Sequence, residues 1–212
     1  MSGDWQTDEG RTELLELGSA TLYEASKQHC CLPAVLRPAW PGARVVGSAL
    51  PVRAAAGDNL PLHLAVEAAR RGEVLVVDAA GAAHGYWGEV MTVAAQVRGV
   101  LGLVIDGGVR DTVELQELAF PVFSRWTALQ CTAKSDPGSV GEPIELGGVR
   151  VERGDAVVAD ADGVAVIPAA RVADVVAAGH DRVRDEADYM RRLRAGELTM
   201  DIYGFRRDAG TH

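Results

Sequence analysis

The sequence predicts an α/β fold with a central sheet flanked by helices, and three features of its pattern support this. A helical apolar stripe over residues 88–98 is followed at once by a short continuous apolar run over 101–105, which is typical of a strand covered on both faces. A similar pair precedes it: a helix with Pro61 in its first turn, and an apolar run over 73–78. Short alternating segments between residues 145 and 167 are separated by glycine- and aspartate-rich turns, which indicates a section of antiparallel hairpins.

Capping residues and glycines predict where several helices begin and end. Gly18 is expected to end a short helical turn, and Ser19 to cap the helix that follows. Either Asp58 or Asn59 is expected to cap the helix that contains Pro61. In the 88–98 helix the apolar residues recur at i, i+3, i+4 and i+7, so we expect that stripe to pack against the sheet. The stripe consists of Val90, Val93, Ala94 and Val97.

The length of 212 residues suits one domain with an appended helix. We expect residues 1–10 to be disordered and the α/β domain to span 11–168. Pro168 precedes a long, highly charged segment, so we expect residues 169–212 to form a C-terminal helical extension. Such a charged helix is either solvated or packed on a neighbouring subunit.

Composition and charge exclude several kinds of partner. Lys plus Arg number 21 against 30 for Asp plus Glu, a net charge of −9. This balance argues against a nucleic-acid partner, which needs basic patches, but it permits one small anion at a local arginine. No apolar run reaches the roughly 18 residues of a membrane span, and the acidic N-terminus does not resemble a signal peptide. The three cysteines lack metal-site or disulfide spacing, so we expect a cytoplasmic protein with no membrane partner.

The candidate site lies beyond the 101–105 strand. Asp106-Gly107-Gly108 is expected to break that strand and deliver Arg110 and Asp111 at the sheet edge where α/β proteins bind ligands. Arg110 offers a planar fork for a carboxylate, and Asp111 a hard oxygen ligand for a divalent cation. An Arg-Asp pair after a strand is also typical of a surface ion pair or a helix cap. The beginning of the preceding helix offers free amides as a second anion site, at Gly88, Glu89, Val90 and Met91.

Other catalytic classes find little support in the sequence. It contains no G-x-G-x-x-G, no P-loop and no G-x-S-x-G motif. Lys27 and Lys134 are its only lysines, and Lys134 lies near Asp136 in a polar segment, unlike the buried lysine of an imine-forming aldolase. Metal-dependent chemistry is therefore favoured over imine chemistry.

The spacing of the charged residues resembles a known family. Glu89, twenty intervening residues and then Arg110-Asp111 are similar to the D-X20-R-D motif of the divalent-metal-dependent 4-hydroxy-4-methyl-2-oxoglutarate aldolases, with Glu in place of the usual Asp. Relatives of that family include the regulators of ribonuclease activity A. Three further segments resemble the family: GDNLPLH at 57–63, VLVVDA at 74–79 and VIDGGVRD at 104–111.

The resemblance implies a swivelling β/β/α architecture, a homotrimer or homohexamer, and a lyase that cleaves a 4-hydroxy-2-oxo acid to pyruvate and a second carbonyl compound. Oxaloacetate decarboxylation would be a side activity, and the alternative function is a non-catalytic regulator that binds a ribonuclease. By resemblance, Asp111 would bind Mg²⁺ or Mn²⁺, Arg110 and the helix amides would bind the 2-oxo acid, and Glu89 would position a catalytic water. A glutamate from an adjacent subunit's C-terminal helix completes the site in the family; Glu186 is the best match by position, and Glu197 is the alternative.

Overall fold

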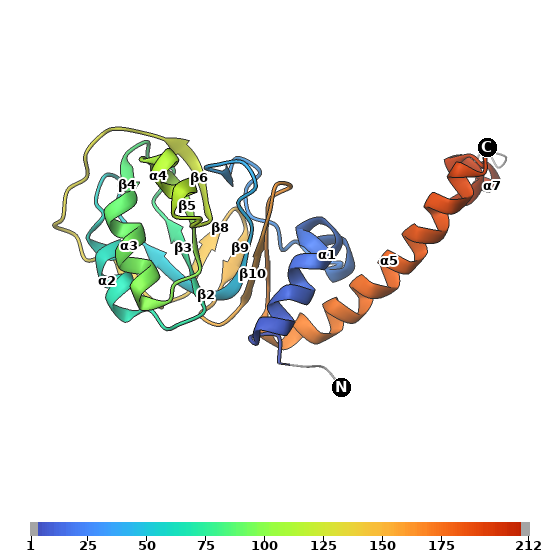
Figure 1. Cartoon of the computed structure of the whole chain (residues 1–212), viewed down its shortest axis with the longest axis horizontal. Helices are drawn as coiled ribbons and strands as arrows, with labels where there is room; N and C mark the ends of the chain where they lie inside the picture. The colour runs from blue at the N-terminus through green and yellow to red at the C-terminus, as the bar shows by residue number, and fades with distance from the viewer. Residues whose placement is uncertain (1–3, 209–212) are drawn as a thin grey trace.

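A nine-stranded sheet forms the centre of the computed structural model, which describes residues 4–208 (Figure 1). Its central path contains four parallel strands, in the spatial order β6 (Val122–Thr127), β5 (Gly102–Val109), β3 (Glu73–Asp78) and β2 (Val45–Arg53). Antiparallel strands extend both edges: β1 (Arg37–Pro38) beside β6, and β10 (Ala156–Ala159) with β11 (Val164–Ile167) beside β2. Two short strands complete it, β4 (Gly85–Trp87) on β5 and β7 (Ser139–Val140) on β2. The expected α/β sheet and its antiparallel section are confirmed.

Each face of the parallel strands is covered by a different layer. Three helices lie on one face: α2 (Leu60–Ala68), α3 (Glu89–Arg98) and α4 (Thr112–Glu117). On the other face lies a separate two-stranded sheet of β8 (Ile144–Leu146) and β9 (Val149–Val151). Alternating residues of β3 and β5 therefore enter two distinct apolar cores, which explains why these strands are apolar throughout.

Helices α1 (Asp8–Ser26) and α5 (Val172–Arg194) pack together beside the sheet (Figure 1). Gly18 interrupts α1 with a non-helical φ of 76°, as its position in the sequence predicts. The next residue, Ser19, does not cap by its own side chain: its N–H and hydroxyl both donate to the carboxylate of Asp160, at 2.8 and 2.6 Å. Helix α1 begins at Asp8 after the cap residue Thr7, so residues 8–10 are helical where disorder was expected. Residues 1–3 lie outside the described part.

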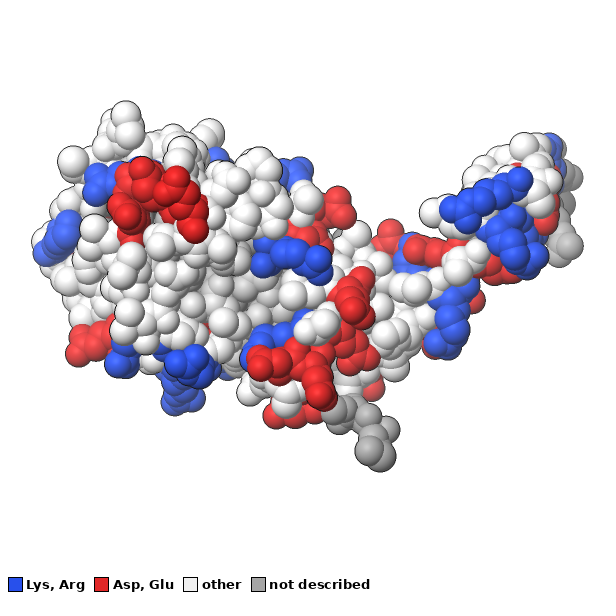
Figure 2. Space-filling view, in the orientation of Figure 1, with Lys and Arg blue, Asp and Glu red and all other residues white. Residues whose placement is uncertain are grey.

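A short 3-10 turn (Ala169–Arg171) precedes α5. The second half of α5 extends away from the domain, and with α6 (Thr199–Ile202) and α7 (Phe205–Asp208) it forms a C-terminal arm (Figure 1). Acidic and basic side chains lie side by side along it in Figure 2, and they include the pairs Arg182–Glu186 and Arg192–Glu197. Within residues 4–208, no helix is both long and apolar enough to cross a bilayer.

Strand β5 continues through Asp106-Gly107-Gly108 to Val109, so the predicted strand break is wrong. The register shifts between Ile105 and Gly108, where the strand carries an irregularity in place of an end. Gly108 has to lack a side chain because a Cβ there would collide with the carbonyl oxygen of His84. These glycines thus let β4 approach β5 closely instead of ending the strand.

The apolar stripe of α3 faces outward, contrary to the expectation from its periodicity. Val90 and Val97 are 81% and 79% exposed, whereas Met91, Thr92 and Ala95 are buried. On the inward side, the Trp87 indole donates to the Thr92 hydroxyl at 2.7 Å, and Met91 and Ala95 pack into the core beside it. Figure 2 shows a largely uncharged surface over this helix.

A buried ion pair joins β3 to the turn between β9 and β10. Both oxygens of the buried Glu73 carboxylate accept hydrogen bonds from Arg153, at 2.7 and 3.0 Å, and one of them also accepts from the Arg70 N–H. We predict that Arg153→Ala lowers the free energy of unfolding by about 3 kcal/mol, because the Glu73 charge would stay buried without its partner. Chemical denaturation measures this loss. Arg150→Ala is the matched control: its exposed pair with Glu152 should contribute less than about 1 kcal/mol, and an equal loss in both variants would contradict the assignment.

Candidate active site

Arg110 and Asp111 lie directly beyond the end of β5, as predicted. Asp111 adopts a left-handed conformation with φ 57° and ψ 41°, which is uncommon for residues other than glycine and frequent at functional sites. Its Oδ2 accepts a hydrogen bond from the Glu89 N–H at 3.0 Å and lies 3.8 Å from Nε of Arg110. The end of β5 is thereby joined to the beginning of α3.

The approach of Asp111 to α3 depends on Gly88. A Cβ at this position would collide with Oδ2 of Asp111 and would also contact the Arg110 side chain. Of the N–H groups at the helix start, that of Glu89 donates to Asp111. The other three, those of Gly88, Val90 and Met91, have no acceptor within residues 4–208. Free amides at a helix N-terminus favour an anion.

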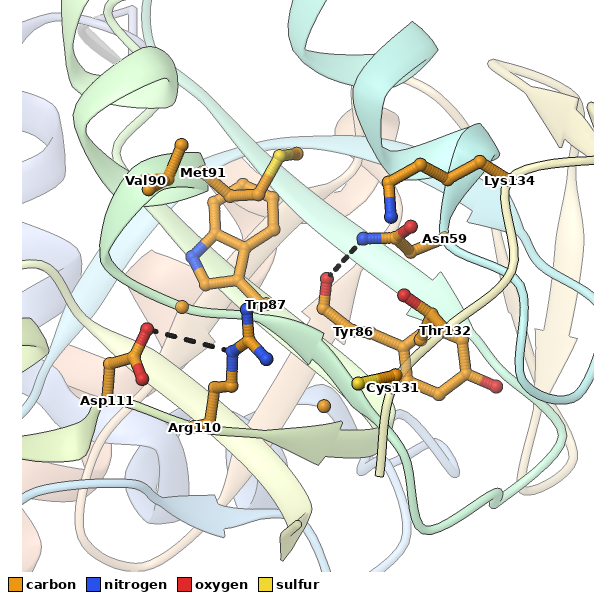
Figure 3. Close-up of a pocket in the computed structure, with 12 residues that line it drawn as sticks. Asn59, Tyr86, Trp87, Val90, Met91, Arg110, Asp111, Cys131, Thr132 and Lys134 are labelled. Atoms are coloured by element: carbon orange, nitrogen blue, oxygen red, sulfur yellow. Dashed lines mark hydrogen bonds and ion pairs between the residues drawn. The ribbon is translucent and has the colours of Figure 1, made fainter. Parts of the chain in front are cut away.

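These groups line a cavity of about 150 Å³ between the β4–α3 connection and the loop that follows β6 (Figure 3). Trp87 forms part of its wall and is held from behind by a stacked Phe120, with ring centroids 6.1 Å apart. Arg110 and Asp111 occupy one side of the cavity, whereas Asn59 and Lys134 occupy the other (Figure 3). The site therefore has a second set of polar groups in addition to the predicted ones.

The three glutamates assigned to the site lie outside this cavity. Glu89 contributes its backbone N–H to Asp111, and its exposed side chain is not part of the cavity wall. Glu186 and Glu197 lie on the C-terminal arm, where they pair with Arg182 and Arg192, each at 2.7 Å. A single chain thus brings together Gly88, Val90, Met91, Arg110 and Asp111.

The donor set at Asp111 suits only some cations. Residues 4–208 contain no cluster of three or more His, Cys, Asp or Glu side chains placed to hold a metal ion. One carboxylate with room for water and ligand oxygens is what Mg²⁺ commonly accepts, whereas a structural zinc site requires four protein ligands. The 37% exposed Asp111 side chain therefore fits a Mg²⁺ or Mn²⁺ ion that keeps much of its water.

Asn59 is a site residue that local sequence reasoning offered as a helix cap, although it lies in the segment 57–63 that resembles the family. The structure assigns the cap bond to Asp58, whose Oδ1 accepts from the Leu60 N–H at 2.9 Å. The Asn59 side chain turns to the cavity instead, and its Nδ2 donates to the Tyr86 carbonyl oxygen at 3.0 Å. Two adjacent capping-type residues where a helix needs one were the available signal.

Asp58 also fixes the loop that carries Lys134. Its Oδ2 accepts from the N–H and hydroxyl of Ser135 at 2.7 and 2.8 Å and from the N–H of Asp136 at 3.0 Å. Burial by itself would raise the pKa of Asp58, but these donors and the Leu60 N–H outweigh burial and hold the pKa well below its ordinary value. The carboxylate therefore remains charged, and the loop anchored, throughout the neutral and mildly acidic range.

The fold and the site define the chain's class. The family described as RraA-like, Aldolase/RraA, matches residues 19–166. The chain belongs to this family, as its motif spacing indicated.

Individual relatives cover most of the chain. A Halalkalibacterium halodurans protein named "putative 4-hydroxy-4-methyl-2-oxoglutarate aldolase" is 33% identical over 81% of this chain and 82% of its own. A solved structure, that of Streptomyces coelicolor RraAS2, is described as an unusual member of the RNase ES inhibitor RraA protein family. It is 28% identical in sequence, the match covers 89% of this chain and 98% of that chain, and the TM-score is 0.74. The RNA-processing inhibitor RraA from Thermus thermophilis is 29% identical, covers 70% and 91%, and has a TM-score of 0.64.

We predict that Asp58→Asn speeds amide exchange at Ser135 and Asp136 by roughly tenfold or more, because a charge-assisted set of hydrogen bonds is lost. Hydrogen–deuterium exchange of a 131–138 peptide, corrected for intrinsic rates, measures this. The depressed pKa means that wild-type protection is complete above the unfolded pKa of about 3.9 and is lost only as the pH falls through the lower folded value. Protection should therefore be the same at pH 7 and pH 5.

Glu142→Gln is the control for this variant, since that exposed side chain makes no hydrogen bond or ion pair within residues 4–208. Unchanged exchange in Asp58→Asn, or protection in the wild type that disappears already near pH 5, would show that Asp58 does not anchor the loop.

Proposed function

We propose that the chain is a divalent-metal-dependent aldolase that cleaves a 4-hydroxy-2-oxo acid, such as 4-hydroxy-4-methyl-2-oxoglutarate, to pyruvate and a second carbonyl compound. The observation that carries this is the convergence of the Arg110 guanidinium, the Asp111 carboxylate and three free N–H groups in one small cavity. A 2-oxo acid presents a carboxylate next to a keto oxygen, which this set of groups matches. The name of the Halalkalibacterium halodurans relative agrees with the proposal.

Each group has a defined task in this reaction. Asp111 would hold Mg²⁺ or Mn²⁺, which as a Lewis acid polarises the keto group. The N–H groups of Gly88, Val90 and Met91 bind the substrate carboxylate. Arg110 stabilises the negative charge that develops on the keto oxygen, and a preorganised donor of this kind contributes about 3 kcal/mol.

Bond breaking then involves two proton transfers, one from the C4 hydroxyl and one to C3. A water takes the proton of the C4 hydroxyl, the C3–C4 bond breaks, and its electron pair forms the pyruvate enolate. Glu89, whose exposed side chain lies outside the cavity wall in the single chain, would have to turn toward Asp111 to position that water. Protonation of C3 completes pyruvate, and the C4 fragment leaves as a carbonyl compound. Oxaloacetate decarboxylation would occur as a side activity because it produces the same enolate.

We further propose that the active unit is a homotrimer or homohexamer in which a neighbour's arm completes the site. The arm carries Glu186 and Glu197 away from their own domain (Figure 1), so neither can serve the cavity of the same chain in this arrangement. Of the exposed valines of α3, Val90 lines that cavity, whereas Val93 and Val97 lie further along the helix; a second subunit would cover all three.

A non-catalytic role is the alternative, favoured by the similarity to the two RraA proteins. Such a protein would act by binding a ribonuclease and would release no pyruvate. A binding surface alone has no use for free amides and an arginine inside a cavity, which is why we place the aldolase first.

We predict pyruvate release from 4-hydroxy-4-methyl-2-oxoglutarate with Mg²⁺ or Mn²⁺, abolished by EDTA and restored by added metal. Asp111→Ala should reduce turnover by at least about a thousandfold, because the one direct protein ligand is lost, with the fold unchanged by circular dichroism. A coupled pyruvate assay measures both. Asp162→Ala, in an exposed turn, is the control. Metal-independent turnover, or wild-type activity in Asp111→Ala, would contradict the site assignment.

The shared site has its own test. Asp111→Ala and Glu186→Ala should each be inactive, but mixed oligomers of the two should recover part of the activity, because some cavities then combine an intact Asp111 with a neighbour's intact Glu186. Activity is measured after dissociation, mixing and verified reassembly. Full activity of Glu186→Ala alone excludes this residue, and Glu197→Ala then becomes the variant to mix.

A further inference from the structure

The three cysteines of the chain differ in their access to solvent. Cys30 is buried, and its sulfur lies 3.3 Å from the Ser26 hydroxyl. Burial raises the pKa of the Cys30 thiol, which disfavours the reactive thiolate. Cys31 is partly buried, and its backbone forms a bridge with Ala165 of β11. Cys131 is exposed, so it is the cysteine that a dissolved reagent reaches most readily.

The fold holds Cys131 at a fixed place in the wall of the cavity. This residue belongs to the loop after β6 and lines the cavity (Figure 3). On one side of it, the Gln130 carbonyl oxygen accepts a hydrogen bond from the Gly85 N–H at 2.8 Å. On the other side, the Ala133 N–H donates to the Gly57 carbonyl oxygen at 2.7 Å. The backbone on both sides of the cysteine therefore positions its thiol beside the site.

The charge of the cavity wall attracts anionic reagents to this thiol. The wall contains two cationic side chains, Arg110 and Lys134, and one acidic side chain, Asp111. A cleft lined by positive charge raises the local concentration of anions. An anionic disulfide should therefore reach Cys131 more readily than an uncharged one.

An unsatisfied acceptor in the same cavity indicates that a molecule binds there. Asn59 is only 6% exposed, and within residues 4–208 its Oδ1 has no hydrogen-bond partner, although its Nδ2 is bonded to Tyr86. Leaving a buried amide oxygen unpaired is costly, and such exceptions in folded proteins call for an explanation. Because Asn59 and Cys131 line the same cavity, an N–H group of a molecule attached to the sulfur would satisfy this oxygen.

We propose that Cys131 is a modification site at which a small anionic peptide thiol forms a mixed disulfide, and that this adduct closes the cavity. Glutathione represents the chemistry, since it offers carboxylates to Arg110 and Lys134 and amide N–H groups to Oδ1 of Asn59. With about 150 Å³ available, the cavity cannot hold such a peptide and a substrate together. The modification is independent of the proposed function, whereas the consequent loss of turnover rests on it.

The reaction is a thiol–disulfide exchange with the oxidised, disulfide form of the peptide thiol. The Cys131 thiolate attacks one sulfur, the S–S bond of the reagent breaks, and its electron pair leaves with the other half of the reagent. The leaving thiolate takes up the proton that Cys131 has lost. Cys131 is thereby oxidised and the leaving half reduced, and an added dithiol reverses the step.

Mass spectrometry of the intact protein after incubation with glutathione disulfide tests the site. We expect a mass gain of one glutathionyl group, which peptide mapping assigns to Cys131, and a loss of pyruvate release in proportion to the modified fraction. Dithiothreitol should reverse both. Cys131→Ser should gain no mass, and its turnover should equal that of its own untreated sample. Cys31→Ser is the matched control and should respond to the disulfide like the wild type.

The outcomes separate the modification from its effect. A wild-type protein without the adduct, or with the adduct on Cys30 or Cys31, would overturn the modification site. Full turnover of the completely modified protein would overturn the closure of the cavity. If the untreated protein releases no pyruvate, the proposed function and the loss of turnover fall together, and the mass spectrum by itself decides the modification.

The selection for an anionic reagent has its own test. Dithiobis(nitrobenzoic acid) is dianionic at neutral pH and dithiodipyridine is uncharged. The ratio of their rates at Cys131, taken as the difference from Cys131→Ser and divided by the same ratio for N-acetylcysteine amide, reports the local charge. We expect this quotient to exceed one in the wild type, and Lys134→Met to lower it by about fivefold, the effect of one unit charge on another at about 4 Å in water.

Lys27→Met is the control for this variant, since it removes the chain's other lysine, which is exposed at the end of α1, and it should leave the quotient unchanged. Equal quotients in the wild type and Lys134→Met would overturn the selection for an anionic thiol.

Discussion

The hydrogen bond from the Glu89 N–H to Oδ2 of Asp111 is the constraint on which the rest of the site depends. It requires a left-handed backbone at Asp111 and the absence of a side chain at Gly88, and both conditions are met. Its geometric result is that the end of β5 meets the beginning of α3, so the carboxylate and the free amides face the same cavity. Its electrostatic result is that the positive end of α3 lies beside Arg110, where an anion is favoured.

Local signals made much of the fold predictable. The strands β2, β3 and β5, the hairpin of β10 and β11, and both ends of α3 follow from apolar runs, turn residues and helix-capping positions that act over a few residues. The orientation of α3 was not predictable, because periodicity says which residues share a face but not where that face points. Tertiary contacts on the other side of the helix, the bond between Trp87 and Thr92 and the packing of Met91 and Ala95, go with the inward face, and the four stripe residues are left at the surface.

The candidate site also contains residues that could be predicted from the sequence and residues that could not. Arg110 and Asp111 could be predicted because they are adjacent in sequence and follow a buried strand, so one element delivers both. Asn59 and Lys134 lie far apart in the sequence and meet only because Asp58 holds the second loop against the first. No pattern in either segment predicts that contact. Asp58 and Asn59 are typical of alternative helix caps, and Lys134 is typical of an exposed loop lysine. Tertiary hydrogen bonds separate the two neighbours into an anchor and a cavity residue.

The cavity wall carries a net positive charge, whereas the whole chain is negatively charged. The net charge of −9 is spread over the molecule, and at physiological salt its field is screened beyond about 8 Å. Within the cavity, Arg110 and Lys134 lie closer to a bound ligand than most of that charge, and Asp111 is the one acidic side chain of its wall. With a divalent cation on Asp111, the wall would carry a surplus of positive charge, enough to offset the two carboxylates of a dicarboxylic 2-oxo acid. An acidic protein can therefore hold a dianion, because the local groups and not the total charge decide the affinity.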